Sequence, residues 1–73
     1  FYLNDLIGFG VVDENNIDYG KIVDILNTSA NDIIIIDYKN KEIMIPVVEK
    51  YVMLFDFKNK LVKVNNIREF INL

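Results

Sequence analysis

The fold is decided by residues 31–46, which read NDIIIIDYKNKEIMIP. The run Ile33–Ile36 consists of β-branched residues only, and it predicts a strand that is buried on both faces or packed inside a barrel. The polar triplet Lys39–Lys41 predicts a turn after that strand. The chain then returns as a second strand over Glu42–Ile45, which Pro46 ends because proline has no N–H to donate to a sheet.

Four further stretches of strand character lie on either side of this hairpin. They are Gly8–Val12, Gly20–Leu26, Tyr51–Phe57 and Leu61–Val64. The chain therefore holds about six short strands spaced roughly 8–12 residues apart, which is typical of an all-β sandwich or barrel. Connections this short exclude the crossovers of βαβ units. We predict a small closed or partly open β-barrel and favour closure, because an open sandwich would leave many exposed edges.

Alternation within the second of these strands predicts the direction of its side chains. Ile22 and Asp24 fall on one face, and Lys21, Val23 and Ile25 fall on the other.

Two short helical segments are also predicted. After Pro46, one face of a single helical turn collects four apolar residues, namely Val47, Val48, Tyr51 and Val52. Near the end of the chain, Asn66 and Glu69 have the spacing of a capping box. Apolar residues at positions 67, 70 and 71 then share one face, which predicts a short C-terminal helix.

Composition limits the function. The chain has 73 residues, which is room for one domain, and it has neither histidine nor cysteine. It therefore lacks the usual general bases, nucleophiles and transition-metal ligands, so we predict no enzyme activity, no metal and no cofactor. The longest apolar run, Ile43–Val48, is far shorter than the ~20 residues that span a bilayer, so no membrane partner is expected.

Other polar and small residues have structural interpretations. The segment Asp13–Asp18 is similar to a calcium loop, but its sixth residue is not glycine and its twelfth falls in a predicted strand, so a solvated turn is favoured. The glycines at positions 8, 10 and 20 have no phosphate-binding spacing and indicate bulges or turns of positive φ. Five lysines, at 39, 41, 58, 60 and 63, lie near two turns that would form a small basic patch if the turns adjoin.

Five motifs follow one another along the chain. They are Phe1-Tyr2 with Asp5-Leu6-Ile7-Gly8, Tyr19-Gly20-Lys21-Ile22-Val23 with Ile25-Leu26, Ser29-Ala30-Asn31-Asp32, Glu42-Ile43-Met44-Ile45-Pro46, and Phe55-Asp56 with Lys60. In this order they resemble the PRC-barrel domain of the ribosome maturation factor RimM, from Phe1 to about Val64. The chain departs from that family at Phe1, where tyrosine is common, at Ser29, where glycine is usual, and in its divergent segment 65–73.

The resemblance implies that residues 1–73 form one PRC-barrel domain, the C-terminal part of a longer two-domain protein. It implies a noncatalytic, cytoplasmic factor that binds the small ribosomal subunit and assists maturation of its head and rRNA processing. The partner implied is the basic ribosomal protein S-nineteen, and the binding residues implied are Phe1 and Tyr2. These two aromatics either form that binding patch or cover the first strand at a domain junction.

Charge separates the expected partners. The chain carries 8 basic and 11 acidic residues, a net charge of −3, which fits a basic protein better than RNA. Direct RNA contact is therefore a secondary expectation. The alternative function is a PRC-barrel adaptor in a membrane-associated or signalling context, and the sequence upstream of Phe1 would distinguish the two.

Overall fold

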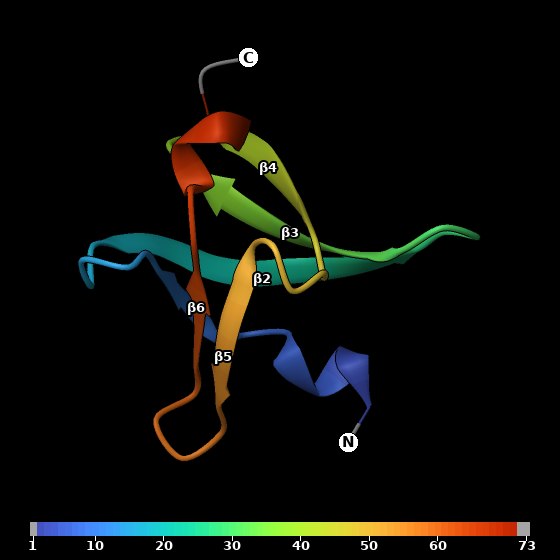
Figure 1. Cartoon of the computed structure of the whole chain (residues 1–73), viewed down its shortest axis with the longest axis horizontal. Coiled ribbons are helices and arrows are strands. Elements are labelled where there is room, and N and C mark those ends of the chain that lie inside the picture. Colours follow the sequence, from blue (N-terminus) through green and yellow to red (C-terminus); the bar gives the residue numbers. More distant parts are fainter. Residues whose placement is uncertain (1, 72–73) are drawn as a thin grey trace.

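The computed structural model describes residues 2–71, which fold into one curved six-stranded sheet with two short 3-10 segments (Figure 1). Along the chain the elements are η1 (Leu3–Leu6), β1 (Gly10–Val12), β2 (Asp18–Asn27), β3 (Asp32–Tyr38), β4 (Lys41–Pro46), β5 (Val52–Asp56), β6 (Leu61–Val64) and η2 (Ile67–Phe70). The strand order in the sheet is β4-β3-β2-β1-β6-β5. All six predicted strands are confirmed, and no bound shifts by more than two residues.

The β3–β4 hairpin forms as the deciding stretch predicts. Its two-residue turn is made by Lys39 and Asn40, whose φ angles of 52° and 65° lie in the left-handed region. A two-residue hairpin turn of type I′ requires positive φ at both of its residues, and its twist matches that of the paired strands. Tyr38 pairs with Lys41 at the turn, and the register continues to the pair of Ile33 with Pro46. The predicted strand end at Pro46 is confirmed.

The predicted faces of β2 are wrong, because a β-bulge interrupts the alternation. Ile22 pairs with Ile36, but the next paired residue is Asp24, opposite Ile35, so Val23 is an extra residue in β2. One inserted residue moves every later side chain to the other face of a strand. Before the bulge, Ile22 lies buried on the inner face opposite Ile36. After it, Asp24 lies on the outer face opposite Ile35, so Ile22 and Asp24 do not share a face.

The sheet does not close into a barrel, so the prediction of closure is wrong and the partly open form is observed. β1 joins the two halves of the sheet by pairing antiparallel with β2 and parallel with β6. This leaves β4 and β5 as the outer strands, each with one neighbouring strand among residues 2–71. The 46–52 connection links these two strands, and η2 contacts β4 and packs Phe70 against Tyr51 of that connection (Figure 1).

The predicted helical turn after Pro46 is confirmed. Val48 O accepts hydrogen bonds from the N–H groups of Tyr51 and Val52, at 3.0 and 2.9 Å. Tyr51 O in turn accepts a bond from Asn65 N at 2.6 Å, which ties this turn to the end of β6. The Tyr51 ring also packs edge-on against Phe70 of η2, with ring centroids 4.8 Å apart.

The C-terminal helix is only a single 3-10 turn, and the predicted capping box is wrong. Asn66 has a left-handed backbone (φ 57°, ψ 37°), and its side chain makes no cap hydrogen bond. An N-cap needs extended backbone angles to aim its side chain at the following N–H groups. Instead, the backbone O of Asn66 accepts the bond from Glu69 N, at 3.1 Å.

The core lies between the inner face of the sheet, η1 and η2. Its buried members come from every element except β5, and they are Leu6, Phe9, Val11, Tyr19, Ile22, Ile34, Ile36, Ile43, Ile45, Val62, Val64 and Ile67. Two of the glycines have the predicted positive φ, Gly8 at 95° and Gly20 at 101°. Gly20 also sits close to β3, since a Cβ there would lie 2.9 Å from the backbone O of Asp37.

Candidate partner-binding surface

Tyr2 is held by its backbone while its side chain points into solvent. Its N–H donates to the carboxylate of Asp5 at 3.3 Å, and its O accepts from Asp5 N at 2.9 Å. The Tyr2 residue is 82% exposed, so its ring does not cover the first strand. Phe1, the other predicted binding residue, lies outside the described residues.

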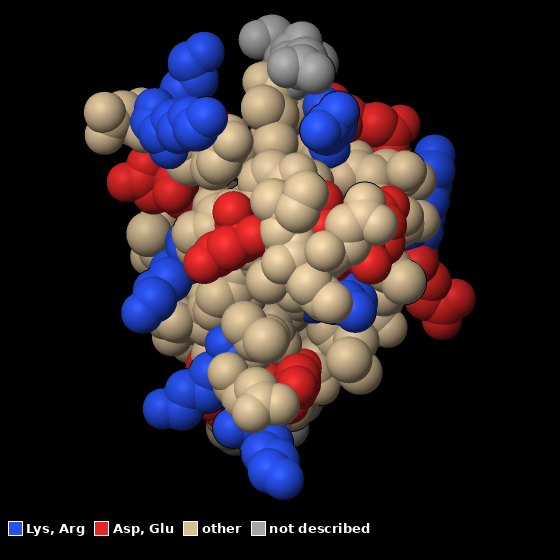
Figure 2. All heavy atoms as spheres, turned by 90° about the vertical axis from the view of Figure 1, so that its left-hand side faces the viewer, with Lys and Arg blue, Asp and Glu red and all other residues tan. Residues whose placement is uncertain are grey.

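The lysine-bearing turns do not adjoin. In Figure 1 the β3–β4 turn, which holds Lys39, lies beside η2, whereas the β5–β6 turn, which holds Lys58 and Lys60, lies at the opposite end of the molecule. Figure 2 shows one face of the surface, where most basic side chains lie around the margin and acidic or uncharged atoms occupy the centre. The two turns therefore do not combine into one basic patch.

An apolar surface that the sequence did not single out lies on the outward side of β2, β3 and β4. Cross-strand register places its members in two adjacent rows, Leu26 with Ile33 and Pro46, and Asp24 with Ile35 and Met44. The apolar members of these rows, Leu26, Ile33, Ile35, Met44 and Pro46, are named here the outer apolar face.

Ile35 marks the centre of this face. It is only 7% exposed, yet it does not belong to the core cluster that contains its neighbours Ile34 and Ile36. Side chains alternate across a strand, so Ile35 points away from the core and is covered by its cross-strand neighbours. Met44, directly opposite, is 47% exposed. The unbroken isoleucine run predicted burial on both faces of this strand. That prediction is the feature of the sequence from which an apolar outer surface could have been found.

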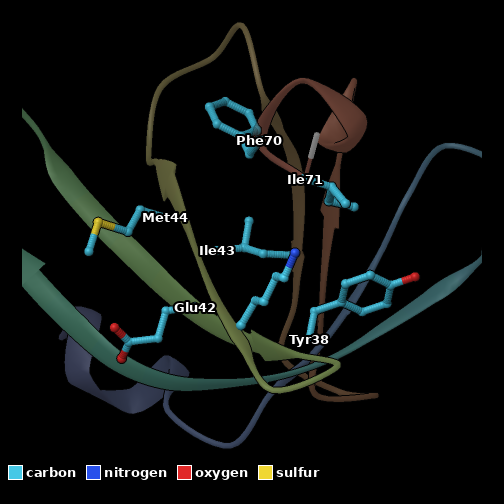
Figure 3. Close-up of a pocket in the computed structure, with 7 residues that line it drawn as sticks. Tyr38, Glu42, Ile43, Met44, Phe70 and Ile71 are labelled. Atoms are coloured by element: carbon cyan, nitrogen blue, oxygen red, sulfur yellow. The ribbon is translucent and has the colours of Figure 1, made fainter. Parts of the chain in front are cut away.

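A hollow of about 350 Å³ adjoins the outer apolar face at the β4 edge. It is lined by residues of the β3–β4 hairpin and of the C-terminal segment, namely Tyr38, Lys41, Glu42, Ile43, Met44, Phe70 and Ile71. Figure 3 shows Glu42 and Met44 on one side of β4 and Ile43 on the other, facing the C-terminal segment. Met44 therefore borders both the hollow and the outer apolar face.

Asp13, in the β1–β2 turn, has a structural role. Its carboxylate accepts hydrogen bonds from Asn15 N at 2.8 Å, Ile17 N at 2.9 Å and the Tyr19 hydroxyl at 3.2 Å. Burial raises the pKa of Asp13, but these hydrogen bonds and the charge of Arg68 outweigh it and hold the pKa below 3.8. The carboxylate thus organises its own turn, as the turn interpretation predicted, although it is buried and not solvated.

Two features are absent from residues 2–71. No three acidic side chains in this part of the chain come together in a way that could hold a metal ion. No helix in the same residues is long and apolar enough to cross a membrane.

Comparison with known proteins gives consistent matches. A family model described as the RimM PRC barrel domain matches residues 3–69. Proteins named ribosome maturation factor RimM from Francisella tularensis subsp. tularensis and Neisseria meningitidis serogroup B are 40% and 36% identical to this chain over 52 residues. Each of these matches covers 71% of this chain and 31% of the relative.

A solved structure from Pseudomonas aeruginosa, described as a 16S ribosomal RNA processing protein RimM, superposes with a TM-score of 0.85. Its sequence identity is 24%, and the match covers 96% of this chain and 46% of that protein, so this likeness concerns the fold. The chain thus spans less than half the length of these matched proteins. Since the family model covers almost all of it, the chain belongs to the RimM PRC barrel domain family.

Proposed function

We propose that this chain is the small-subunit-binding module of a ribosome maturation factor, acting in head maturation and rRNA processing. The observation that carries the proposal is the family match over residues 3–69. The matched relatives from Francisella and Neisseria are named ribosome maturation factors, which supports a role in binding without catalysis. On this proposal the chain works in the cytoplasm as one of two domains of a longer protein.

The partner proposed within the subunit is the basic ribosomal protein S-nineteen. The net charge of −3 supports a basic protein, because opposite charges speed the encounter of two proteins and select against acidic partners. Direct RNA contact is secondary, since phosphate binding draws on clustered lysine and arginine and the two lysine-bearing turns lie apart.

The contact residues proposed are Phe1 and Tyr2. The geometry of Tyr2 supports this role, because Asp5 fixes its backbone and leaves the ring free to enter a partner. A tyrosine held in this way offers a large contact area and loses little conformational freedom on binding.

The test measures binding of the immobilised chain to purified small ribosomal subunits and to isolated S-nineteen. The wild-type chain is expected to capture both, and the double variant Phe1→Ala/Tyr2→Ala is expected to bind at least about tenfold more weakly. Tyr2→Phe is the matched control, because it keeps the ring and removes only the hydroxyl group. Failure of the wild-type chain to capture S-nineteen would overturn the proposed partner, and unchanged affinity of the double variant would overturn the aromatic contact alone.

The match to a RimM-specific family model supports this function over the PRC-barrel adaptor. The adaptor alternative is tested in the same experiment, since an adaptor would capture neither the subunit nor its proteins.

A further inference from the structure

The outer apolar face is unusual because its side chains are apolar although no helix or strand in residues 2–71 covers it. One face of an antiparallel sheet normally packs on the core and the other carries polar residues. Here the inner face of β2, β3 and β4 supplies the core, and the outward rows are apolar as well. Leu26 and Met44 leave a large part of their side chains in solvent around the covered Ile35. Exposed apolar groups that lie next to one another in this way mark interaction surfaces.

The charges around this face are mainly negative. Outward positions on its three strands hold the carboxylates Asp24, Asp37 and Glu42, with Asp37 paired to Glu42 across β3 and β4. Among the described residues of these three strands, Lys21 is an outward cation, and it pairs with Gly10 of β1. Carboxylates at these positions would repel RNA phosphates, and a second copy of this chain would bring like charges together.

The outward side of β1, β5 and β6 differs in charge. Val12, Leu54 and Leu61 there form an apolar surface around a hollow of about 110 Å³, but Lys63 and Asp56 line it together. Its charges are balanced, so it selects no sign of partner. The excess of carboxylates is therefore particular to the outer apolar face.

We propose that the outer apolar face is the docking surface for a basic protein with apolar side chains at its contact. The partner's apolar side chains rest on Leu26, Ile35 and Met44, and its lysine or arginine groups meet Asp24, Asp37 and Glu42. This inference rests on the proposed function, and it assigns to that function a second surface besides Phe1 and Tyr2. The hollow beside Met44 extends the same surface and accepts a side chain at the edge of the sheet.

The test uses two variants with matched controls. Met44→Ser removes an apolar contact, and Met53→Ser on β5 is its control, because Met53 is the same residue type with a similar exposed fraction, 53% against 47%. Glu42→Lys reverses a rim charge, and Glu49→Lys makes the same change in the 46–52 connection. All four positions are exposed, so thermal melts are expected to show that every variant folds.

Binding of each variant to purified small subunits and to isolated S-nineteen is measured at low and high salt. Met44→Ser and Glu42→Lys are each expected to bind at least about tenfold more weakly than wild type, and both controls within about twofold. Glu42→Lys is also expected to reduce the salt dependence of binding, because a screened attraction has been removed.

The outcomes separate this inference from the proposed function. Wild-type affinity of both Met44→Ser and Glu42→Lys would overturn the docking surface and leave the proposed function standing. No binding by the wild-type chain would overturn both. A dimer of this chain that Met44→Ser dissociates would assign the face to a second copy. Binding to protein-free 16S rRNA that Met44→Ser weakens and Glu42→Lys strengthens would assign it to RNA. Either result would overturn a basic protein as the occupant.

Discussion

Replacing Ile67 with alanine tests whether η2 is an integral part of the core. Ile67 is 1% exposed and belongs to the core cluster, on a four-residue segment that contacts β4. Removing its buried methyl and methylene groups and leaving a cavity costs about 2–5 kcal/mol. A domain of this length is stable by about 4–11 kcal/mol, so the variant would lose a large share of its free energy of unfolding.

The expected loss corresponds to a fall of at least about 8 °C in Tm for a domain of this size. Circular dichroism melts and urea titrations of Ile67→Ala and wild type measure it at neutral pH. Ile17→Ala is the matched control, because Ile17 is 48% exposed, and it is expected to change stability by less than about 0.5 kcal/mol. A loss below about 1 kcal/mol for Ile67→Ala would refute the argument that η2 completes the core.

Three further predictions concern the turn, the backbone and the proposed contact. Gly20→Ala is expected to destabilise the fold more than Gly8→Ala in urea titrations, because both positions have positive φ but only the Cβ at Gly20 meets the backbone O of Asp37. Equal losses would show that the close approach of the two strands has no cost. The pKa of Asp13 lies below 3.8 in the fold, so its carboxylate stabilises the protein above that pH, and the contribution is lost as the pH falls through the folded pKa. Asp13→Asn should therefore have a lower Tm at neutral pH and a flatter decline of Tm in acid, and parallel pH profiles would contradict this. Tyr2→Ala is expected to keep the Tm of wild type, since the side chain is exposed, and a large fall in its melt would indicate a structural role instead.

The strands could be predicted because each has its own local signal. The isoleucine run, the polar turn at Lys39–Lys41 and the stop at Pro46 each act over a few residues, and together they determine the β3–β4 hairpin. Predicted and observed bounds of β6 are identical, at Leu61–Val64. Predictions from local patterns of this kind are confirmed because the tertiary structure favours the same conformation as the local sequence.

The errors arise where the outcome depends on distant residues. The bulge at Val23 is set by how β2 pairs with β3, and no residue of β2 alone reveals it. Closure depends on the register of all strands together, and here the sheet ends at β4 and β5, which are not neighbours in the strand order. The capping box failed because Asn66 adopts a left-handed backbone, a state that its spacing from Glu69 does not exclude.

The candidate surfaces show the same division. Tyr2 was identified by resemblance, and its exposure follows from η1 and not from any pattern at the residue itself. The outer apolar face joins residues of three strands, so it becomes visible only when the register is known. The isoleucine run predicted that Ile35 is buried, but which neighbours bury it requires the pairing with Asp24 and Met44.

The parallel pairing of β1 with β6 bears on the order in which the chain can fold during synthesis. β2, β3 and β4 form successive hairpins that can pair as soon as they are made, whereas Gly10 must wait for Leu61. Contacts this far apart in sequence close a large loop before they gain any stability, and they form slowly. Until residues 61–64 have left the ribosome, one edge of β1 has no partner and is open to pairing with other chains. We therefore expect nascent chains that stop short of Val64 to be prone to aggregation, even though they already contain the stretch that decides the fold.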